Sequence, residues 1–411
     1  MKQLNLFDNE QDNDLLEMEN FIFDLENQIK ELEEQEQFLK ENNAFDWAKE
    51  FPKCCDGNGH FEGFDVVIGN PPYGVDLDKK SIRYFKENFE SSKTISKKQK
   101  GSTDTYVLFI EKAFNLLNNT GFIHFIVPIS FTSGDSMQAI HNFLFASCET
   151  IKISSYSVRP QPIFESAVVD CSIVEIHKTN TECKHLYSTK MHRKSKNSNF
   201  SELLKNIKFI DVSDFKANGR IPKIGLEIEN RILKKLFSIE NKIRNELIEN
   251  SEDKIYYRAA GGRYFKVFTN YPTNSTAEKS LNLNKDYKNL FGAILSSNLF
   301  FWYYQIFSDN HNLKLYDISG FPFPKDKFST KSIKEIEIIF DEYLKDIEKN
   351  AVIHTNSNYK NIDSFKEYKI GKSKHLIDKI DDLIRNAYNL SKEEQEFIKN
   401  YEIEFRLQEY C

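Results

Sequence analysis

Apolar residues near the start of the chain recur at alternating spacings of three and four. The residues that carry this pattern are Leu15, Met18, Ile22, Leu25, Ile29 and Leu32. Such spacing places them on one face of a helix, in the heptad arrangement of a coiled coil. Glu36 interrupts the pattern and Leu39 resumes it. We therefore predict an amphipathic helix within residues 1–43. Two interpretations remain open: a coiled coil with a partner chain, or one helix that folds back on its own body.

Short apolar runs that are rich in branched residues predict strands further along the chain. These runs are Phe64–Gly69, Phe122–Pro128, Ile151–Val158 and Val168–Ile176. Two helical patterns, Asp104–Leu117 and Met137–Phe145, separate the first three runs. Alternation of strands with helices is typical of an α/β fold. We expect Phe64–Gly69 to be a buried strand of a parallel sheet, because it is short, apolar and ended by glycine.

The character of the chain changes after the last of these strands. Residues 181–220 are polar and basic, and we interpret them as a linker between domains. Residues 221–325 predict an α+β domain whose aromatic-rich helix, Tyr287–Phe307, we interpret as core rather than as a base-stacking surface. Residues 326–411 predict a charged helical region. The expected layout is thus a helix at 1–43, a domain at 44–180, a linker, a second domain and a helical end.

The formal charge of −6 is unevenly distributed along the 411 residues. The first 50 residues hold 15 acidic and 4 basic side chains, which leaves 47 acidic and 52 basic ones for the rest. The body of the chain is therefore mildly basic, which suits contact with nucleic acid. No apolar run has the length of a membrane span and no signal-peptide pattern opens the chain, so we expect a cytoplasmic protein that does not cross a membrane.

Two basic segments are candidates for contact with phosphates. Residues 79–100, within an expected loop at 74–103, carry eight basic against two acidic side chains, and residues 184–208 carry seven against one. Lys and Arg neutralise DNA phosphates without reading base sequence. The candidate DNA-binding residues are Lys79, Lys80, Arg83, Lys97, Lys98, Lys100, Arg193 and Lys194. A solvated surface loop is the alternative interpretation for residues 79–100.

The six cysteines show no spacing that predicts a disulfide framework. Cys54 and Cys55 lie close in sequence to His60, but no second pair of ligands completes a metal site. We therefore expect reduced thiols and no bound metal.

The tetrapeptide Asn70-Pro71-Pro72-Tyr73 directly follows the first predicted strand, at the end where open α/β sheets bind their ligands. The amine of adenine is a weak nucleophile, because its lone pair is delocalised into the ring. The Asn70 side-chain carbonyl and the Pro71 backbone carbonyl could accept its two hydrogens. The two prolines fix the backbone and carry no amide hydrogen, and Tyr73 could stack on an extruded base. A plain turn after a strand is the alternative.

The run Phe64–Tyr73 resembles the catalytic motif of the gamma-class N6-adenine DNA methyltransferases, specifically the TaqI-like and Type IIG restriction–modification enzymes. Weaker similarities keep the order of that family at Phe45–Pro52, Thr103–Tyr106, Gly121–Pro128, Phe164–Ile176, Leu290–Phe323 and Ile377–Phe397, so that the resemblance covers residues 44–400. It implies S-adenosyl-L-methionine as methyl donor and double-stranded DNA as substrate. It also implies a partial Rossmann-like methyltransferase sheet and a C-terminal target-recognition domain, which corresponds to residues 221–325.

The chain departs from that family upstream of the motif. Members of the family carry a glycine-containing loop for the methyl donor after their first strand, whereas the residues before Phe64 predict an acidic helix and no such loop. We therefore assign no donor-binding residue, and we expect a partner chain to supply that half. The family also places a second aromatic residue against the base, where Ile176 stands here, so Phe164 or Phe131 would have to replace it.

These observations predict a site-specific DNA adenine N6-methyltransferase of the restriction–modification type, with Asn70, Pro71, Pro72 and Tyr73 as its catalytic residues. The alternative is a non-catalytic DNA-recognition subunit, or a truncated remnant of such an enzyme. The two hypotheses differ in whether the chain supports methyl transfer to DNA.

Overall fold

The computed structural model describes residues 7–41, 45–94, 96, 100–164, 169–179, 181–194, 200–261, 265–355 and 364–407. The chain divides into two compact units, Met1–Phe64 and Asp65–Cys411. The two units are described separately below.

The first unit begins with the predicted amphipathic helix. Helix α1 spans Phe7–Glu41, which confirms the helix but does not decide between the two interpretations of its apolar face. The short helix α2 (Trp47–Glu50) and the turn that follows it lie in a cluster of aromatic rings whose neighbouring centroids are 4.6–6.4 Å apart. The rings of this cluster belong to Phe45, Trp47, Phe51, Phe61 and Phe64.

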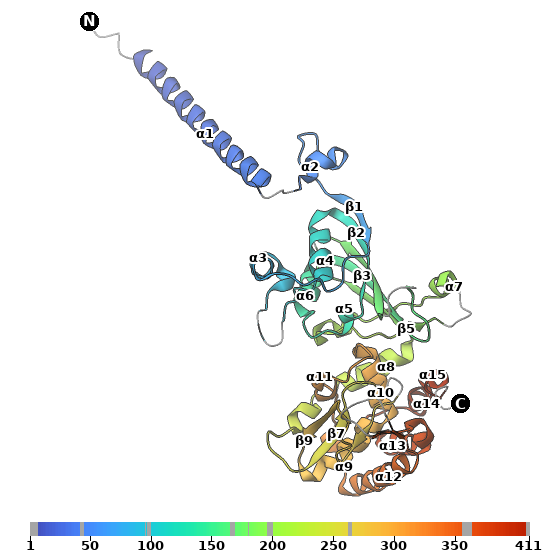
Figure 1. The fold of residues 1–411 in the computed structure, drawn as a ribbon. Helices are drawn as coiled ribbons and strands as arrows, with labels where there is room; N and C mark the ends of the chain where they lie inside the picture. Colours follow the sequence, from blue (N-terminus) through green and yellow to red (C-terminus); the bar gives the residue numbers. More distant parts are fainter. Residues whose placement is uncertain are drawn as a thin grey trace. The chain divides into compact units, whose positions relative to one another are not determined.

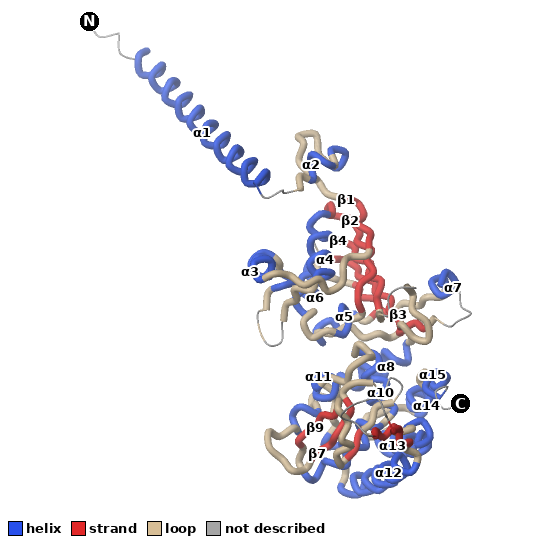
Figure 2. Tube along the Cα trace, in the orientation of Figure 1, coloured by secondary structure: helices blue, strands red, loops and turns tan. Residues whose placement is uncertain are grey.

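A six-stranded sheet organises the first part of the second unit, in the order β1-β2-β4-β3-β5-β6. Figure 2 colours the strands red. Its strands are β1 (Phe64–Gly69), β2 (Leu117–Pro128), β3 (Cys148–Ser157), β4 (Cys171–Lys178), β5 (His185–Arg193) and β6 (Ile210–Asp211). Strand β4 lies antiparallel between β2 and β3, and β3 runs parallel to β5. The α/β prediction is confirmed, but the sheet is mixed rather than purely parallel.

Two helices cover one face of this sheet, as Figure 1 shows. Helix α4 (Thr105–Leu116) connects β1 to β2, and α6 (Gln138–Ser147) connects β2 to β3. Alternate residues of β2, namely Ile123, Phe125 and Val127, are buried in the same cluster as the apolar side of α4. Burial of one face with the period of a strand therefore fixes the register of β2.

The prediction that Phe64–Gly69 is a buried strand is wrong. Strand β1 lies at the edge of the sheet, where β2 is its neighbour. The side chains of Val66 and Ile68 are 52% and 77% exposed, whereas Val67 packs against the core. A short run of branched residues predicts a strand but contains no information on how many neighbours that strand has.

The interpretation of residues 181–220 as a linker is also wrong. Strand β5 belongs to the sheet, β6 pairs with it, and α7 (Phe200–Lys205) lies between the two. The side chains of Ser188 and Thr189 are fully buried, and the Thr189 hydroxyl accepts a hydrogen bond from the Ser155 amide. Small polar residues that satisfy their hydrogen bonds inside the sheet hide the apolar pattern of a strand.

The C-terminal part of the second unit packs around one buried aromatic helix. It contains a three-stranded antiparallel sheet, whose strands lie in the order β8 (Phe268–Thr269), β7 (Lys254–Arg258) and β9 (Glu278–Asn282). Its surrounding helices are α8 (Glu227–Phe237), α9 (Lys288–Ser296), α11 (Leu315–Ser319), α12 (Thr330–Lys349), α13 (Lys374–Ile384), α14 (Lys392–Asn400) and α15 (Ile403–Leu407). A two-stranded ladder joins β10 (Val352–Thr355) to β11 (Ser364–Glu367).

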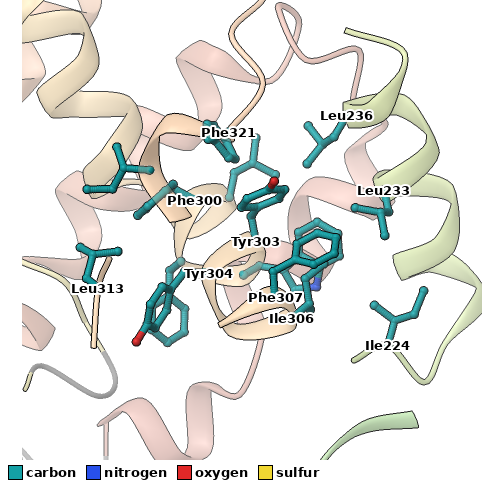
Figure 3. Close-up of a cluster of buried hydrophobic side chains, with 14 of the residues drawn as sticks. Ile224, Leu233, Leu236, Phe300, Tyr303, Tyr304, Ile306, Phe307, Leu313 and Phe321 are labelled. Atoms are coloured by element: carbon teal, nitrogen blue, oxygen red, sulfur yellow. The ribbon is translucent and has the colours of Figure 1, made fainter. Parts of the chain in front are cut away.

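Helix α10 (Asn298–Phe307) is the core of this part, since each of its residues is buried. Figure 3 shows its side chains among those of α8 and neighbouring segments: Phe300, Tyr303, Tyr304, Ile306 and Phe307 lie with Leu233, Leu236, Leu313 and Phe321. The interpretation of the aromatic stripe as core is thus confirmed. The single helix that we predict over Tyr287–Phe307 is two helices, because Ser297 ends α9 and caps α10.

A buried carboxylate from another helix completes the N-terminus of α10. The Asp381 carboxylate of α13 accepts hydrogen bonds from the Asn298 and Leu299 amides, at 3.1 and 3.2 Å, and from the Asn298 side chain at 2.7 Å. Burial raises the pKa of Asp381 to about 6. These contacts satisfy amide groups that a helix leaves unpaired at its first turn.

We predict that Asp381→Ala lowers the free energy of unfolding by about 2 kcal/mol, because it leaves buried amide donors at the start of α10 without an acceptor. Urea denaturation followed by circular dichroism measures this change. Asp341→Ala on the exposed side of α12 is the matched control, with an expected change within about 0.5 kcal/mol. Equal effects of the two substitutions would contradict the prediction.

Candidate active site

The loop that follows β1 exposes the polar side chain of Asn70 ahead of two residues, Pro72 and Tyr73, that hydrogen bonds hold in place. Asn70 is exposed, Pro71 is buried, Pro72 is exposed and Tyr73 is half-buried. Gly74 has a φ of +64°, a conformation that L residues rarely adopt, so the chain turns sharply directly after Tyr73. Among the residues that the structure describes, none forms a hydrogen bond with the Asn70 side chain.

Thr105, the first residue of α4, holds this loop in place. Its buried hydroxyl donates to the Pro72 carbonyl at 2.8 Å and accepts from the Val75 amide at 3.4 Å. The Pro72 carbonyl is therefore occupied, whereas the Pro71 carbonyl has no hydrogen-bond partner within the described part of the chain. The carbonyl without a partner, that of Pro71, is the one that the sequence analysis assigns to the adenine amine.

Tyr73 is anchored through its hydroxyl. The Tyr73 hydroxyl donates to the Ile126 carbonyl of β2 at 2.9 Å, and the ring packs against the buried core. Burial, with a smaller contribution from Cys171, raises the pKa of Tyr73 to about 12. The side chain is therefore a neutral phenol whose ring is fixed at one end, which is the state that a stacking surface needs.

The structure corrects the expected position of a second aromatic residue. Ile176 pairs with Ile123 and Ile151 in the middle of the sheet and is fully buried, so it does not lie at the site. Phe131 is buried as well, with its ring 5.1 Å from that of His141. Phe164 is half-buried and remains a candidate.

The predicted loop at 74–103 contains a helix. Helix α3 spans Lys79–Asn88, and its apolar side chains Ile82 and Phe85 are too few to reveal a helical pattern. The Glu111 carboxylate of α4 accepts hydrogen bonds from the Glu90 and Ser91 amides, at 2.9 and 2.8 Å. Helix α4 thus supports this segment as well as the loop after β1.

The basic candidates at 79–100 have different environments. Lys79, Lys80 and Arg83 are exposed on α3, where Arg83 also pairs with Glu87 at 2.8 Å. Lys100 forms an ion pair with Asp135 at 2.7 Å. Lys97 and Lys98 lie outside the described residues. Lys79 and Lys80 are thus the described residues of this group for which no ion pair is found.

The prediction that Arg193 contacts DNA is wrong. Its side chain is 3% exposed and donates to both oxygens of Glu402, at 3.0 and 2.7 Å, and to the Ser157 hydroxyl at 3.1 Å. These contacts fasten the end of β5 to the C-terminal segment. Lys194, its neighbour, is half-buried, and its backbone forms a bridge with Gln161. Charge density in a sequence does not distinguish a buried arginine from an exposed one.

The described residues offer neither a metal site nor an assignable donor pocket. No group of three or more His, Cys, Asp or Glu side chains gathers among them. The described residues that precede β1 form α1, α2 and the aromatic cluster, so they do not fit a glycine loop between a strand and a helix. In the part of the chain that the structure describes, no helix combines the length and apolar character of a membrane span.

Comparison with known proteins gives similarity to restriction–modification methylases over part of the chain. Residues 2–164 match the family described as Eco57I restriction-modification methylase. RM.MjaORFECS2P of Methanocaldococcus jannaschii is 32% identical over 117 residues, which are 28% of this chain and 9% of that protein. The type II methyltransferase M.TthHB8I of Thermus thermophilus is 34% identical over 85 residues, which are 20% of each chain.

Each of these similarities covers only part of this chain and only part of the relative. The type II restriction enzyme and methyltransferase RM.Eco57I of Escherichia coli is 26% identical over 136 residues, which are 32% of this chain and 13% of that protein. The chain therefore matches less than a quarter of the length of these curated relatives. Among solved structures, the Type IIL restriction-modification enzyme MmeI in complex with DNA is similar over 89% of this chain and 58% of that chain, with 14% identity and a TM-score of 0.48. The residues 2–164 that match the Eco57I restriction-modification methylase family include Asn70–Tyr73 and Thr105.

The sequence identifies the loop and includes Thr105 in the weaker similarity at Thr103–Tyr106, but it assigns Thr105 no role, because its hydrogen-bond partner lies 33 residues away. We predict that Thr105→Val lowers the free energy of unfolding by about 1 kcal/mol and speeds amide hydrogen exchange at Val75. Exchange followed by mass spectrometry measures the latter. Thr105→Ser restores the hydroxyl and the protection, and Thr103→Val is the control. Unchanged exchange at Val75 in Thr105→Val would show that the hydroxyl does not hold the loop.

Proposed function

We propose that this chain is the base-binding part of a DNA adenine N6-methyltransferase of the restriction–modification type. The observation that supports the proposal most directly is the division of the carbonyl groups after β1. Thr105 occupies the Pro72 carbonyl, whereas the Pro71 carbonyl and the Asn70 side chain have no hydrogen-bond partner among the described residues. The partial similarity to restriction–modification methylases supports the reaction class.

In this proposal the two free acceptors activate the adenine amine. Each accepts one amino hydrogen, which draws the nitrogen lone pair out of the ring and towards the methyl group. Acceptors that are already oriented need no reorganisation during the reaction, and such preorganisation is a large source of rate enhancement. Pro71 and Pro72 keep the backbone fixed, and they add no amide donors that would compete for the acceptors.

The proposed substrate base is extruded from the duplex, because its amine cannot be reached inside the helix. Tyr73 is suited to receive it, since its hydroxyl is tied to Ile126 and its ring cannot turn away freely. Phe164 is the candidate for a second contact with the base. Stacking on an aromatic ring replaces part of the stacking that the base loses in the duplex.

S-adenosylmethionine is the proposed methyl donor, and it supplies a sulfonium whose methyl group transfers without a metal or a nucleophilic side chain. The described residues before β1 do not fit a donor pocket, so none of them is assigned to it. We propose that a partner chain supplies the donor-binding half. The second candidate function is a DNA-recognition subunit, or a remnant of such an enzyme, without turnover.

We predict that Asn70→Ala lowers methyl transfer to DNA by at least about 100-fold, because it removes one of two preorganised acceptors. Incorporation of labelled methyl groups into genomic DNA measures this, with and without the product of the neighbouring upstream gene. Asn119→Ala, at an exposed position of β2, is the matched control and should retain the wild-type rate. Sequence-specific DNA binding without transfer under either condition would favour the recognition subunit.

We also predict that the double substitution Lys79→Ala and Lys80→Ala reduces the salt dependence of DNA binding by about two in the slope of log affinity against log salt. Fluorescence anisotropy at several salt concentrations measures that slope. Arg193→Ala is the informative comparison: it should lower stability, because it leaves Glu402 without its partner, but it should leave the slope unchanged. If Arg193→Ala reduced the slope and the lysine double variant did not, Arg193 rather than Lys79 and Lys80 would be the residue that contacts phosphates.

A further inference from the structure

Helix α1 carries an apolar face at its heptad positions from Met18 to Leu32. Figure 1 draws it as one uninterrupted helix, and it spans 35 residues. The described apolar side chains on it are 41–64% exposed; they are Met18, Phe21, Ile22, Phe23, Leu25, Ile29 and Leu32. A lone helix of this kind gains little from propensity alone, and most helices in proteins are stabilised by packing of their apolar face.

The order of branched and unbranched residues along this face selects a coiled-coil type. In the heptad numbering that fits the spacing, Ile22 and Ile29 occupy a positions, and Leu25 and Leu32 occupy d positions. Isoleucine at a with leucine at d favours two parallel helices. Glu36 falls at the next a position, where a polar residue fixes register at a cost in stability.

The charges beside this face favour a partner of different sequence over a second copy of the chain. From Met18 to Leu39 the e positions that follow d residues are acidic, namely Glu19, Glu26 and Glu33, and the next e position is Lys40. In a parallel pair each e position faces a g position of the other helix. The g positions of this chain from residue 21 onward are Phe21, Gln28 and Gln35, none of which is a cation. An antiparallel copy would oppose e to e, glutamate to glutamate.

We propose that α1 forms a parallel two-stranded coiled coil with a helix of a different polypeptide, one that carries apolar a and d positions and Lys or Arg at its g positions. Three cations spaced by seven residues would face Glu19, Glu26 and Glu33. The assignment of this partner as the chain that supplies the donor-binding half rests on the proposed function, whereas the pairing chemistry does not.

Labelled synthetic peptides added to the full chain test this pairing. All three peptides have four heptads with Ile at a and Leu at d. The first has Lys at g and Gln at e, the second has Glu at g and Gln at e, and the third has Gln at g and Lys at e. Fluorescence anisotropy gives their affinities, below the concentration at which each peptide pairs with itself. We expect the first peptide to bind at least tenfold more tightly than the other two.

Charge-reversal variants make the test specific. The triple variant E19K/E26K/E33K should prefer the peptide with Glu at g. The triple variant D24K/E31K/E34K changes the net charge equally at positions that point away from the seam, so it should keep the wild-type preference. Circular dichroism checks that both variants fold. Asn70→Ala should leave peptide binding unchanged, so loss of methyl transfer and loss of pairing are separate outcomes.

Four results would overturn the proposal. Equal affinity for all three peptides would indicate non-specific apolar contact, and tighter binding of the third peptide would indicate an antiparallel pair. A light-scattering mass of two chains, with no uptake of peptide, would assign the face to a second copy. A monomeric chain that binds no peptide would show that α1 packs on its own body.

Discussion

The hydroxyl of Thr105 determines the geometry of the candidate site. Two successive prolines remove two amide donors from the loop after β1, so it can form fewer backbone hydrogen bonds of its own. A buried side chain at the first turn of α4 supplies the missing bond to Pro72 and also accepts from Val75. The shape of the loop therefore depends on a helix that begins 33 residues later in the chain.

Helix α4 supports more than this loop. Its Glu111 carboxylate holds Glu90 and Ser91, so the segment that carries α3 is fastened to the same rigid element. The sheet provides the second support, through the bond from Tyr73 to Ile126. Towards the C-terminal part, Ile221 donates to the Thr132 carbonyl at 2.9 Å and Tyr316 to the Ser133 carbonyl at 3.3 Å. Residues that directly follow β2 are thus bonded to the C-terminal part of the second unit.

The sequence predicts helices and strands well where side-chain periodicity and length agree. It fails where the position of an element or a side chain depends on contacts with distant parts of the chain. The extent of β1 is correct to the residue, but its position at the sheet edge depends on strands that pair with it. Strand β5 is missed because its polar residues are buried and hydrogen-bonded. Arg193 is misassigned because its partner, Glu402, lies 209 residues away. The aromatic stripe of α10 is predicted correctly, since buried rings at helical spacing are commonly core.

The candidate site, too, is only partly predictable from the sequence. Asn70 to Tyr73 is recognisable from four residues and the strand before them, whereas the Thr105 hydroxyl that holds the loop is not.

The identity of the methylated base is the most direct test of the proposed chemistry. Mass spectrometry of nucleosides from DNA incubated with the chain, the methyl donor and its partner measures this base. We predict N6-methyladenine, absent with Asn70→Ala. Methylation of cytosine alone would contradict the assignment of Asn70 and Pro71 as acceptors for the adenine amine.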